Sequence, residues 1–311
     1  MCDRAGVSAA GKQNNMPPAK LSLDTLNAAP KADFVQHLGE IFEHASWVAE
    51  QAGNGCPFAT VTALHDAMMR VVQTAPNSAK LEFLRGHPDL AGKAARAGTM
   101  AASSVSEQAG LGLDRLSDAE FDEFQKLNAA YSEKFGLPFI ICVRRQTRDA
   151  VLAAFRRRLR NTPDTELAAA IEEIGHITRL RLSDAVEGAG MPKISGHLST
   201  HVLDAYHGEP ASGVALELFE LGSEVRARIA AAVTNEAGRT DQPLIHDAPL
   251  RAGRYEIVFR LADYFRRRGL DLPDHPFVDD VVLRFGIDQP EGRYHVPVVA
   301  TPWSYSTYRG S

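Results

Sequence analysis

Residues 187–195 read EGAGMPKIS, and this stretch divides the 311-residue chain into two halves with different hydrophobic patterns. Its glycine and proline content is typical of a linker. Before it, residues 21–187 show the apolar spacing of helices, and after it, residues 196–311 alternate apolar and polar residues. At roughly 100–200 residues per domain, we expect an all-α domain, a linker at 188–195, and an all-β domain.

The helices of the N-terminal half are predicted from the signals at their ends. Ser117 and Glu120 have the spacing of a capping box, and Gly136 follows the last turn of the helix that they begin. The first 20 residues carry no such pattern and are expected to form a disordered tail. Three further helices are expected to begin at N-cap threonines: Thr60, Thr147 and Thr162.

In the C-terminal half, apolar side chains recur at every second residue. In YEIVFRL, residues 255–261, every second side chain is apolar, and VALELFEL at 214–221 behaves in the same way. Turn signals such as HGEPASG at 207–213 and TNEAGR at 234–239 separate these runs. The pattern predicts an antiparallel β-sandwich.

Composition and charge exclude several classes of function. The net charge is -5 and the pI about 6.1, so neither nucleic acid nor an anionic membrane is an expected partner. The basic runs at 155–160 and 265–269 are interpreted as solvated faces. The three cysteines, Cys2, Cys56 and Cys142, are too far apart for a disulfide framework. Because the chain also has no long apolar segment and no secretory signal, the cytoplasm is the expected location.

The motifs of common cofactor and metal sites are absent from the sequence. GLGLDR at 110–115 lacks the third glycine of a dinucleotide fingerprint, and neither H-E-x-x-H nor an EF-hand loop occurs. We therefore expect no cofactor and no metal, and the chemistry must come from side chains alone.

Two histidines and an arginine of the C-terminal half are candidate site residues. His201 lies in SGHLSTHVLD, His295 in YHVPVV, and Arg239 in a turn. A single histidine on a strand is usually a satisfied structural residue, so neither histidine alone indicates a site. The chain ends in YSTYRGS at 305–311, and a terminus so rich in Tyr, Ser and Arg is expected to be tied into the fold rather than frayed.

Together, SGHLSTHVLD, the AGR turn and the terminal YRGS resemble the 5-hydroxyisourate hydrolases, the enzyme branch of the transthyretin-like family, over about residues 195–311. Trp303 and Ser304 depart from the more usual Tyr-Gly of the family, which bears on the packing of the tail. The resemblance implies a transthyretin-like sandwich that assembles as a homotetramer, with active sites in clefts between subunits. It implies these site residues: His201, Arg239, His295, Tyr308 and Ser311.

These residue types suit the attack of water on a ring acyl carbon. A neutral histidine, with an unperturbed pKa of about 6.5, can act as a base near pH 7. A guanidinium stabilises the oxyanion and disfavours charging of nearby histidines. We hypothesise that His201 and His295 activate water while Arg239 holds the developing negative charge. A module that only carries a ligand, and a hydrolase that uses the histidines as metal ligands, are the alternatives.

Several segments of the helical half are candidates for a second site. His87 precedes a proline, so it is expected at a helix end where its side chain can face a cleft. Ser104, Glu107 and Gln108 belong to a segment rich in Ser and Gly, which is predicted to be a loop. The apolar run GLPFIICV at 136–143 is expected to form a buried wall or a backbone hydrogen-bonding edge.

Arg181 is predicted to face the core of the helical half. It continues, at steps of three and four residues, the stripe of Leu167, Ile171, Ile174 and Thr178, whereas Arg179 lies off that stripe. A guanidinium on a core-facing stripe is costly unless it is paired. Its expected partner is either an internal Asp or Glu, or a bound carboxylate.

These segments resemble the decarboxylases of 2-oxo-4-hydroxy-4-carboxy-5-ureidoimidazoline (OHCU) over about residues 21–186, chiefly through GHPDLAGKA, SEQAGLGLDRL and KFGLPFIICVR. Gly86 and Cys56 depart from the more usual Ala and Arg. The resemblance implies dimers of the helical half, catalysis by His87 and Glu107, and Arg179 as a weaker alternative to Arg181. It implies these substrate-binding residues: Pro88, Ser104, Gln108, Phe139, Ile141 and Arg181.

The two resemblances concern consecutive steps on small purine-derived substrates. The sequence therefore predicts a bifunctional urate-degradation enzyme that hydrolyses 5-hydroxyisourate to OHCU and decarboxylates OHCU to (S)-allantoin. Because the conjugated ring can accept the electrons left by carbon dioxide, no pyridoxal or thiamine group is expected. The rival interpretation is a transthyretin-like ligand-binding module fused to a helical scaffold.

Overall fold

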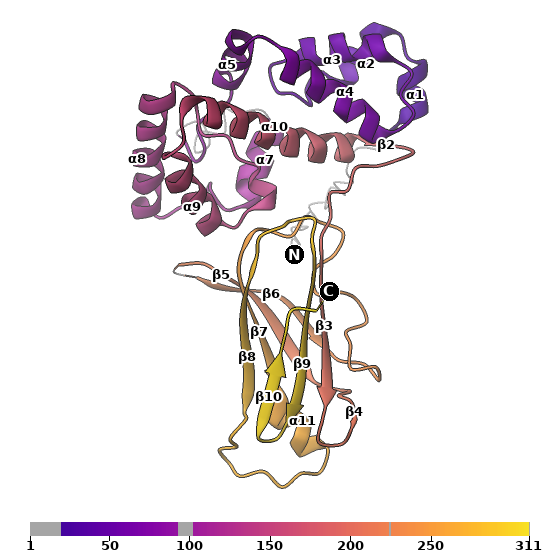
Figure 1. Ribbon diagram of the computed structural model, residues 1–311, viewed down its shortest axis with the longest axis vertical. Helices are drawn as coiled ribbons and strands as arrows, with labels where there is room; N and C mark the ends of the chain where they lie inside the picture. The colour runs from indigo at the N-terminus through magenta and orange to yellow at the C-terminus, as the bar shows by residue number, and fades with distance from the viewer. Residues whose placement is uncertain (1–19, 93–101, 224, 311) are drawn as a thin grey trace, which may run out of the picture.

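The computed structural model describes residues 20–92, 102–223 and 225–310. Residues 1–19 of the predicted tail, and Ser311, lie outside these ranges. A helical part precedes a part built from two β-sheets, and the two parts form an elongated molecule (Figure 1). The predicted fold class, an all-α domain followed by an all-β sandwich, is confirmed.

The helical part follows the predicted end signals. Thr60, Thr147 and Thr162 each cap a helix by accepting a hydrogen bond from the backbone N–H three residues on. The Ser117–Glu120 capping box is present, and Gly136 ends that helix in the left-handed region at φ 65°. The helices are α1 (Leu23–Ala28), α2 (Lys31–Leu38), α3 (Ser46–Ala52), α4 (Val61–Thr74), α5 (Asn77–Arg85), α7 (Ala102–Gly110), α8 (Asp118–Phe135), α9 (Arg148–Arg158) and α10 (Pro163–Ala185), with the 3₁₀ turns η1 (Gly53–Gly55) and η2 (Val143–Arg145).

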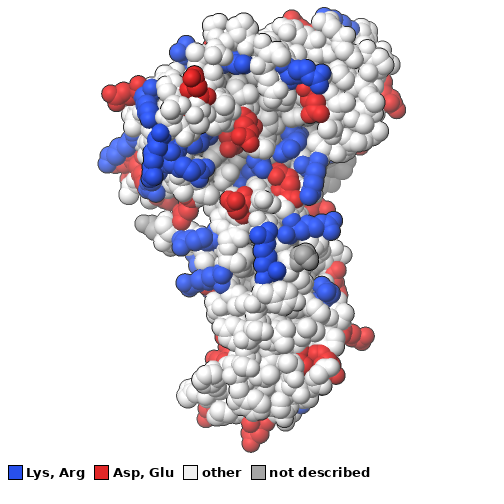
Figure 2. All heavy atoms as spheres, viewed as in Figure 1, with Lys and Arg blue, Asp and Glu red and all other residues white. Residues whose placement is uncertain are grey.

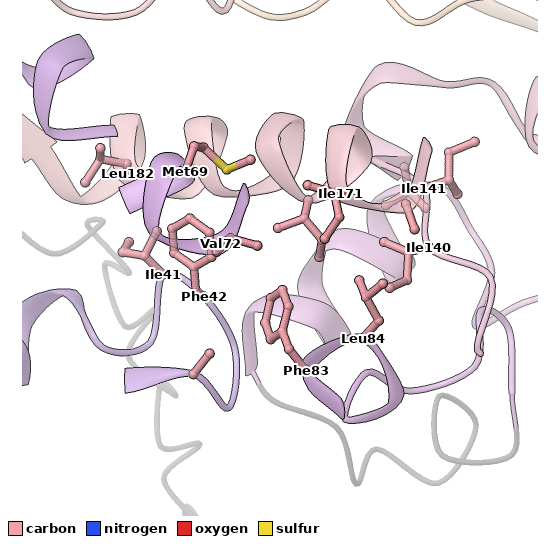
Figure 3. Packing of buried hydrophobic residues seen from close by; sticks show 14 of the residues in the cluster. Ile41, Phe42, Met69, Val72, Phe83, Leu84, Ile140, Ile141, Ile171 and Leu182 are labelled. Carbon is pink, nitrogen blue, oxygen red and sulfur yellow. The ribbon is translucent and has the colours of Figure 1, made fainter. Parts of the chain in front are cut away.

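Helix α10 organises the core of this part. It runs across the whole helical part, from the side of α9 to strand β2 (Val186–Glu187), which pairs in parallel with β1 (Leu21–Ser22) (Figure 1). Figure 3 shows Met69 of α4 and Ile171 of α10 in the same buried layer as Phe83 of α5. The core therefore fixes α5 just before His87.

One expectation for the helical part is wrong, because the basic run at 155–160 is not wholly solvated. Arg158 is only 5% exposed, and it donates to Glu166 Oε1 at 2.8 Å and to the Ile140 carbonyl at 2.7 Å. Glu166 is also buried and accepts from the Tyr131 hydroxyl. Arg158 follows buried Phe155 by three residues, so its guanidinium enters the core, where it requires a carboxylate partner. The second basic run is exposed after Phe265, as expected.

The β part is a sandwich of two four-stranded sheets, ordered β10-β9-β3-β4 and β6-β5-β7-β8. Burial alternates residue by residue along β3, whereas in β7 both Tyr255, Ile257 and Phe259 on one face and Glu256 and Val258 on the other are buried. The expected antiparallel pairing holds except between β3 and β9, which run parallel. The strands are β3 (His197–Asp204), β4 (Glu209–Pro210), β5 (Ala215–Leu221), β6 (Arg226–Val233), β7 (Gly253–Arg260), β8 (Asp280–Ile287), β9 (Arg293–Thr301) and β10 (Ser304–Thr307), with helix α11 (Leu261–Arg267) after β7.

The parallel pair has a physical reason. Parallel strands cannot be joined by a hairpin and need a long crossover, and here the chain between β3 and β9 forms the whole second sheet. The pairing aligns Ser199 with His295 and His201 with Pro297. It therefore brings the two predicted histidines onto adjacent strands.

Polar contacts join the two parts beyond the linker. The backbone N–H of Thr147 donates to the Ala252 carbonyl at 2.9 Å, and the N–H of Ala252 donates to the Arg145 carbonyl at 2.8 Å. Arg145 also makes a two-bond ion pair with Glu291, at 2.9 and 2.8 Å. Figure 2 shows charged side chains of both signs gathered where the two parts meet. No helix within the described ranges is long and apolar enough to cross a membrane.

Candidate active sites

One cavity of the helical part brings together every residue that the sequence predicts for this half. An apolar side of this cavity includes Leu90, Ile140 and Ile177, and Glu43 adds a carboxylate. The predicted residues that line it are His87, Pro88, Ser104, Glu107, Gln108, Phe139, Ile141 and Arg181. Their roles in a reaction stay a prediction.

His87 stands just beyond the end of α5, as expected from the proline that follows it. Its Nδ1 lies 3.2 Å from the Phe83 carbonyl. Because a carbonyl can only accept, Nδ1 carries the proton, and Nε2 of the neutral ring keeps its lone pair. Burial lowers the pKa of His87, against the opposing charge of Glu43. The ring is therefore predominantly neutral at pH 7.

Arg181 faces the same cavity from α10 and is paired there. Its guanidinium donates to the two carboxylate oxygens of Glu107 at 3.0 and 2.8 Å, and to Glu43 Oε2 at 3.3 Å. Ser104 Oγ lies 3.2 Å from Arg181 Nη2 and donates to Glu43 Oε2 at 2.6 Å. The internal carboxylate expected for this arginine is therefore present, in Glu107 and Glu43.

Glu43 is a site residue that the sequence reasoning missed. It is 2% exposed, and its Oε1 has no hydrogen-bond partner among the described residues. It lies in the irregular chain between α2 and α3, directly before His44, whose φ is 62°. The available signal was a carboxylate immediately after Ile41 and Phe42, both of which are buried.

Gln108 supports the loop that carries His87. The side-chain Oε1 of Gln108, on α7, accepts from the backbone N–H of Ala91 at 3.0 Å. Asn128 of α8 donates to the Leu90 carbonyl at 2.8 Å. Residues 104–108 are predicted above to be loop, but they belong to helix α7, so the Ser and Gln side chains project from a regular element. A rigid support of this kind favours a fixed position for His87.

A second cavity lies on the β part, beside strands β3 and β9. His295 Nδ1 lies 3.0 Å from Ser199 Oγ, and this hydrogen bond fixes the orientation of the imidazole. Of the predicted residues, Arg239 and His295 line this cavity, whereas His201 does not. The lining residues are His197, Ser199, Arg239, Arg293, Tyr294 and His295.

His201 nevertheless lies close to Arg239, because the two residues form an antiparallel β-bridge. The Nε2 atom of His201 is buried without a hydrogen-bond partner among the described residues. Burial lowers the pKa of His201, and the positive charge of Arg239 lowers it further. For His295, burial again lowers the pKa, followed by the charges of Arg239 and His201. Both rings are therefore held in the neutral, basic form that the predicted chemistry requires.

Gly238 shapes the turn that presents Arg239. Its φ is 69°, and a Cβ at this position would lie 2.3 Å from the Val202 carbonyl oxygen. The backbone N–H of Val202 donates to the Gly238 carbonyl at 2.8 Å. Only glycine permits this close approach of the turn to β3, which explains the AGR motif.

The C-terminal tail is tied to β9, as expected. The N–H of Gly310 donates to the His295 carbonyl at 3.0 Å, and the Arg309 guanidinium lies 5.0 Å from the centre of the Tyr294 ring. A Cβ at position 310 would lie 2.5 Å from His295 Cδ2. Tyr308 is 61% exposed and does not line the cavity, and Ser311 lies outside the described residues.

Within the described ranges, no group of three or more His, Cys, Asp or Glu side chains is arranged to hold a metal ion. The expectation that neither reaction uses a metal or a cofactor stays a prediction.

Comparison with known families identifies both halves. The OHCU decarboxylase family matches residues 27–183, and the HIUase/transthyretin family matches residues 198–310. The chain therefore belongs to both families: its helical part is an OHCU decarboxylase domain, and its β part is a hydroxyisourate hydrolase/transthyretin domain. Both sequence resemblances are confirmed.

Individual relatives agree with this assignment. The chain is 46% identical over 126 residues to 5-hydroxyisourate hydrolase of Pseudomonas aeruginosa, which covers 40% of this chain and 100% of the relative. It is 39% identical over 165 residues to the OHCU decarboxylase of Haloferax volcanii, covering 53% of this chain and 96% of the relative. A crystal structure of (S)-allantoin synthase matches both parts together, with 34% identity, a TM-score of 0.54, and coverage of 94% of this chain and 100% of the other. The particular arrangement is thus a fusion of two enzyme domains.

Proposed function

We propose that this chain catalyses two consecutive steps of urate degradation, the hydrolysis of 5-hydroxyisourate to OHCU and the decarboxylation of OHCU to (S)-allantoin. One observation carries the proposal: each domain contains its own cluster of imidazole and guanidinium groups, at the positions that its family resemblance indicates. The product of the first reaction is the substrate of the second, which gives the fusion a chemical reason.

In the hydrolase domain, a neutral histidine takes a proton from water while the water oxygen attacks the ring acyl carbon. Arg239 stabilises the resulting oxyanion. The ring C–N bond then breaks, and the proton passes to the leaving nitrogen. The lowered pKa values of His201 and His295 support the role of base, and the Ser199 hydrogen bond supports a fixed direction of attack at His295. The product carries a new carboxylate.

In the decarboxylase domain, the carboxylate leaves as carbon dioxide and its bonding electrons pass into the conjugated ring, whose nitrogen takes a proton from solvent. Neutral His87 then accepts the substrate hydroxyl proton at Nε2 and delivers it to the ring carbon from one side. Glu107 and Gln108 bind ring and ureido groups, and Arg181 binds a substrate oxygen. Delivery from one fixed imidazole makes the product a single enantiomer. The carbonyl bond that fixes the His87 tautomer supports this assignment.

We further propose a homo-oligomer that works in the cytoplasm. Within one chain, Arg239 of the hydrolase cavity and Tyr308 of the tail are both exposed. A tetramer built through the β part would cover them with a second copy, and the helical part is proposed to form dimers. The free thiols of Cys56 and Cys142 are consistent with a reducing compartment.

The decisive experiment supplies urate and a urate oxidase, and follows the absorbance of hydroxyisourate together with the circular dichroism of allantoin. His201→Ala is expected to slow hydroxyisourate loss by about 10²–10⁴-fold, and His87→Ala is expected to slow OHCU decarboxylation by a similar factor. Each variant keeps the other activity. His246→Ala, at an exposed histidine outside both cavities, is the matched control and should change neither rate.

Other results would favour the rival interpretations. Unchanged hydroxyisourate decay in His201→Ala would favour a ligand carrier. A rate that falls on chelation and returns with zinc would identify the histidines as metal ligands. If wild type yields racemic allantoin at the uncatalysed rate, the helical part is a scaffold and not a decarboxylase.

A further inference from the structure

A third cavity lies between the two domains. It is lined by Ala248, Pro249 and Arg251 of the hydrolase domain, and on the other side by residues of α7, η2 and α10 of the decarboxylase domain. Its volume is about 760 Å³, within the range of roughly 300–1,000 Å³ that is usual for small-molecule sites. No role in either reaction has yet been assigned to it.

This interdomain cavity meets the decarboxylase pocket. Glu107, Val143 and Arg181 line both spaces. The ion pair between Arg181 and Glu107, at 2.8 Å, therefore stands at the boundary between them. If Arg181 binds a substrate oxygen, as proposed above, it must loosen its bonds to Glu107, so substrate binding also opens this boundary.

Three arginines and three carboxylates line the cavity, and one of the arginines lacks a close carboxylate partner. Arg251 is 40% exposed, donates to the Gly110 carbonyl at 3.2 Å, and has its nearest carboxylate, Glu220, at 3.9 Å. Arg144, by contrast, is paired with Asp184 at 2.5 Å. Glu40, Asp184 and Glu107 also line the cavity, so Arg251 is the cation there that is least neutralised by a close carboxylate.

A backbone hydrogen bond connects the wall of the same cavity to the hydrolase site. The N–H of Gly196 donates to the Ala248 carbonyl at 3.0 Å, and the next residue, His197, lines the hydrolase cavity. The segment that walls the interdomain cavity is thus bonded to the start of strand β3. The two cavities are thus linked through the Gly196–Ala248 hydrogen bond, three residues before Arg251.

We propose that the interdomain cavity is the entrance through which the carboxylate OHCU reaches the decarboxylase pocket, and that Arg251 of the hydrolase domain attracts it there. The inference rests on the proposed function and extends it. The hydrolase domain then contributes to the second reaction by forming part of the substrate path, in addition to making the substrate.

A charge placed on the cavity wall tests this proposal. Ala248 is exposed and has no part in either catalytic cluster, so Ala248→Glu and Ala248→Lys form a pair of similar size and opposite charge. With OHCU produced by an excess of a separate hydroxyisourate hydrolase, we expect KM for decarboxylation to rise about threefold in Ala248→Glu and to fall in Ala248→Lys at low salt. The difference should fade in 0.5 M salt, at a Debye length of about 4 Å, while kcat stays unchanged.

Arg251→Gln is the second variant and should raise KM about as much as Ala248→Glu. Arg254→Gln is its control, because Arg254 is an exposed arginine that does not line the cavity. The hydroxyisourate hydrolysis rate of each sample reports whether the fold is intact. Equal KM values for Ala248→Glu and Ala248→Lys, with wild type active, would contradict the proposal that this cavity is the entrance for OHCU. If the wild-type protein fails to decarboxylate OHCU, the proposed decarboxylase function itself is wrong.

Discussion

The two active sites of this chain hold their arginines in opposite ways. Arg181 has a side chain only 9% exposed, and two carboxylates, Glu107 and Glu43, share its charge. Arg239 is exposed on a turn, positioned by the backbone bridge to His201. The decarboxylase site is therefore part of a folded core, whereas the hydrolase site is built on a surface by strand register and by the chain terminus. The same residue type should accordingly affect stability in one domain and only chemistry in the other.

Removal of the two arginines should give the largest contrast. Arg181→Ala leaves buried Glu43 and Glu107 without a counter-charge, and breaking a buried pair costs about 3–5 kcal/mol. Arg239→Ala should change the free energy of unfolding by less than about 0.5 kcal/mol, as expected for a surface residue. Urea unfolding of the full chain, followed by far-ultraviolet circular dichroism for the helical part, measures both. Equal losses of stability would contradict the contrast.

Addition of one methyl group should test the hydrolase site with a smaller effect. In Gly310→Ala the new Cβ would lie 2.5 Å from His295 Cδ2, so the ring or the tail must move. A displacement of about 1 Å at a catalytic group costs about 10²-fold in rate. Hydrolysis should fall by that factor while decarboxylation is unchanged. Gly286→Ala, which meets only the Gly253 carbonyl at 3.9 Å, is the control. Full hydrolase activity in Gly310→Ala would show that the tail does not position His295.

Replacement of Arg239 should shift the pH dependence of hydrolysis. The base must be neutral, and the pKa values of His201 and His295 are lowered, so kcat/KM should decline only below pH 6.5. Arg239→Gln removes a positive charge that contributes to both shifts, so both pKa values rise and the acid limb moves to higher pH. The residual activity of the variant between pH 5 and 8 measures this. An acid limb that stays in place or moves lower would contradict the electrostatic role of Arg239.

The smallest effect is expected at Arg179, the alternative to Arg181 in the sequence. Its guanidinium lies 3.5 Å from Glu291 of the hydrolase domain, and it does not line the decarboxylase cavity. Arg179→Gln should leave KM for OHCU unchanged and cost at most about 1 kcal/mol of stability. It should speed proteolysis at the predicted linker, 188–195, because one interdomain contact is lost. A large rise in KM would make Arg179 the substrate ligand instead.

The sequence predicted those features that depend on local spacing. The N-cap threonines Thr60, Thr147 and Thr162 were found because a cap needs only the next three residues. Arg181 was placed facing the core by helical periodicity alone. The same reasoning would have found Arg158, since it follows Phe155 by three residues on the buried face of α9. Arg158 was predicted to be solvated because the run FRRRLR was interpreted from its charge and not from its position on the helix.

The features that were missed depend on contacts between distant segments. Glu43 is held by Ser104, 61 residues away, and by Arg181, 138 residues away. No local pattern marks its partners. The parallel pairing of β3 with β9 likewise depends on the path of the intervening chain between the sheets, and alternation within a strand carries no information about its neighbour. The family resemblances supplied the remaining site residues.

Helix α10 has a further consequence for the fusion. Its 23 residues make a rod of about 34 Å, and residues two positions apart project on nearly opposite sides of it. Arg179 contacts Glu291 of the neighbouring domain and Arg181 lines the decarboxylase pocket, so one helix carries the interdomain contact and the proposed substrate ligand on opposite sides. Because both arginines belong to one helix, we expect a tilt of the β-sandwich against Glu291 to displace Arg181, the proposed substrate ligand, so that the docking of the hydrolase domain affects the geometry of the decarboxylase site.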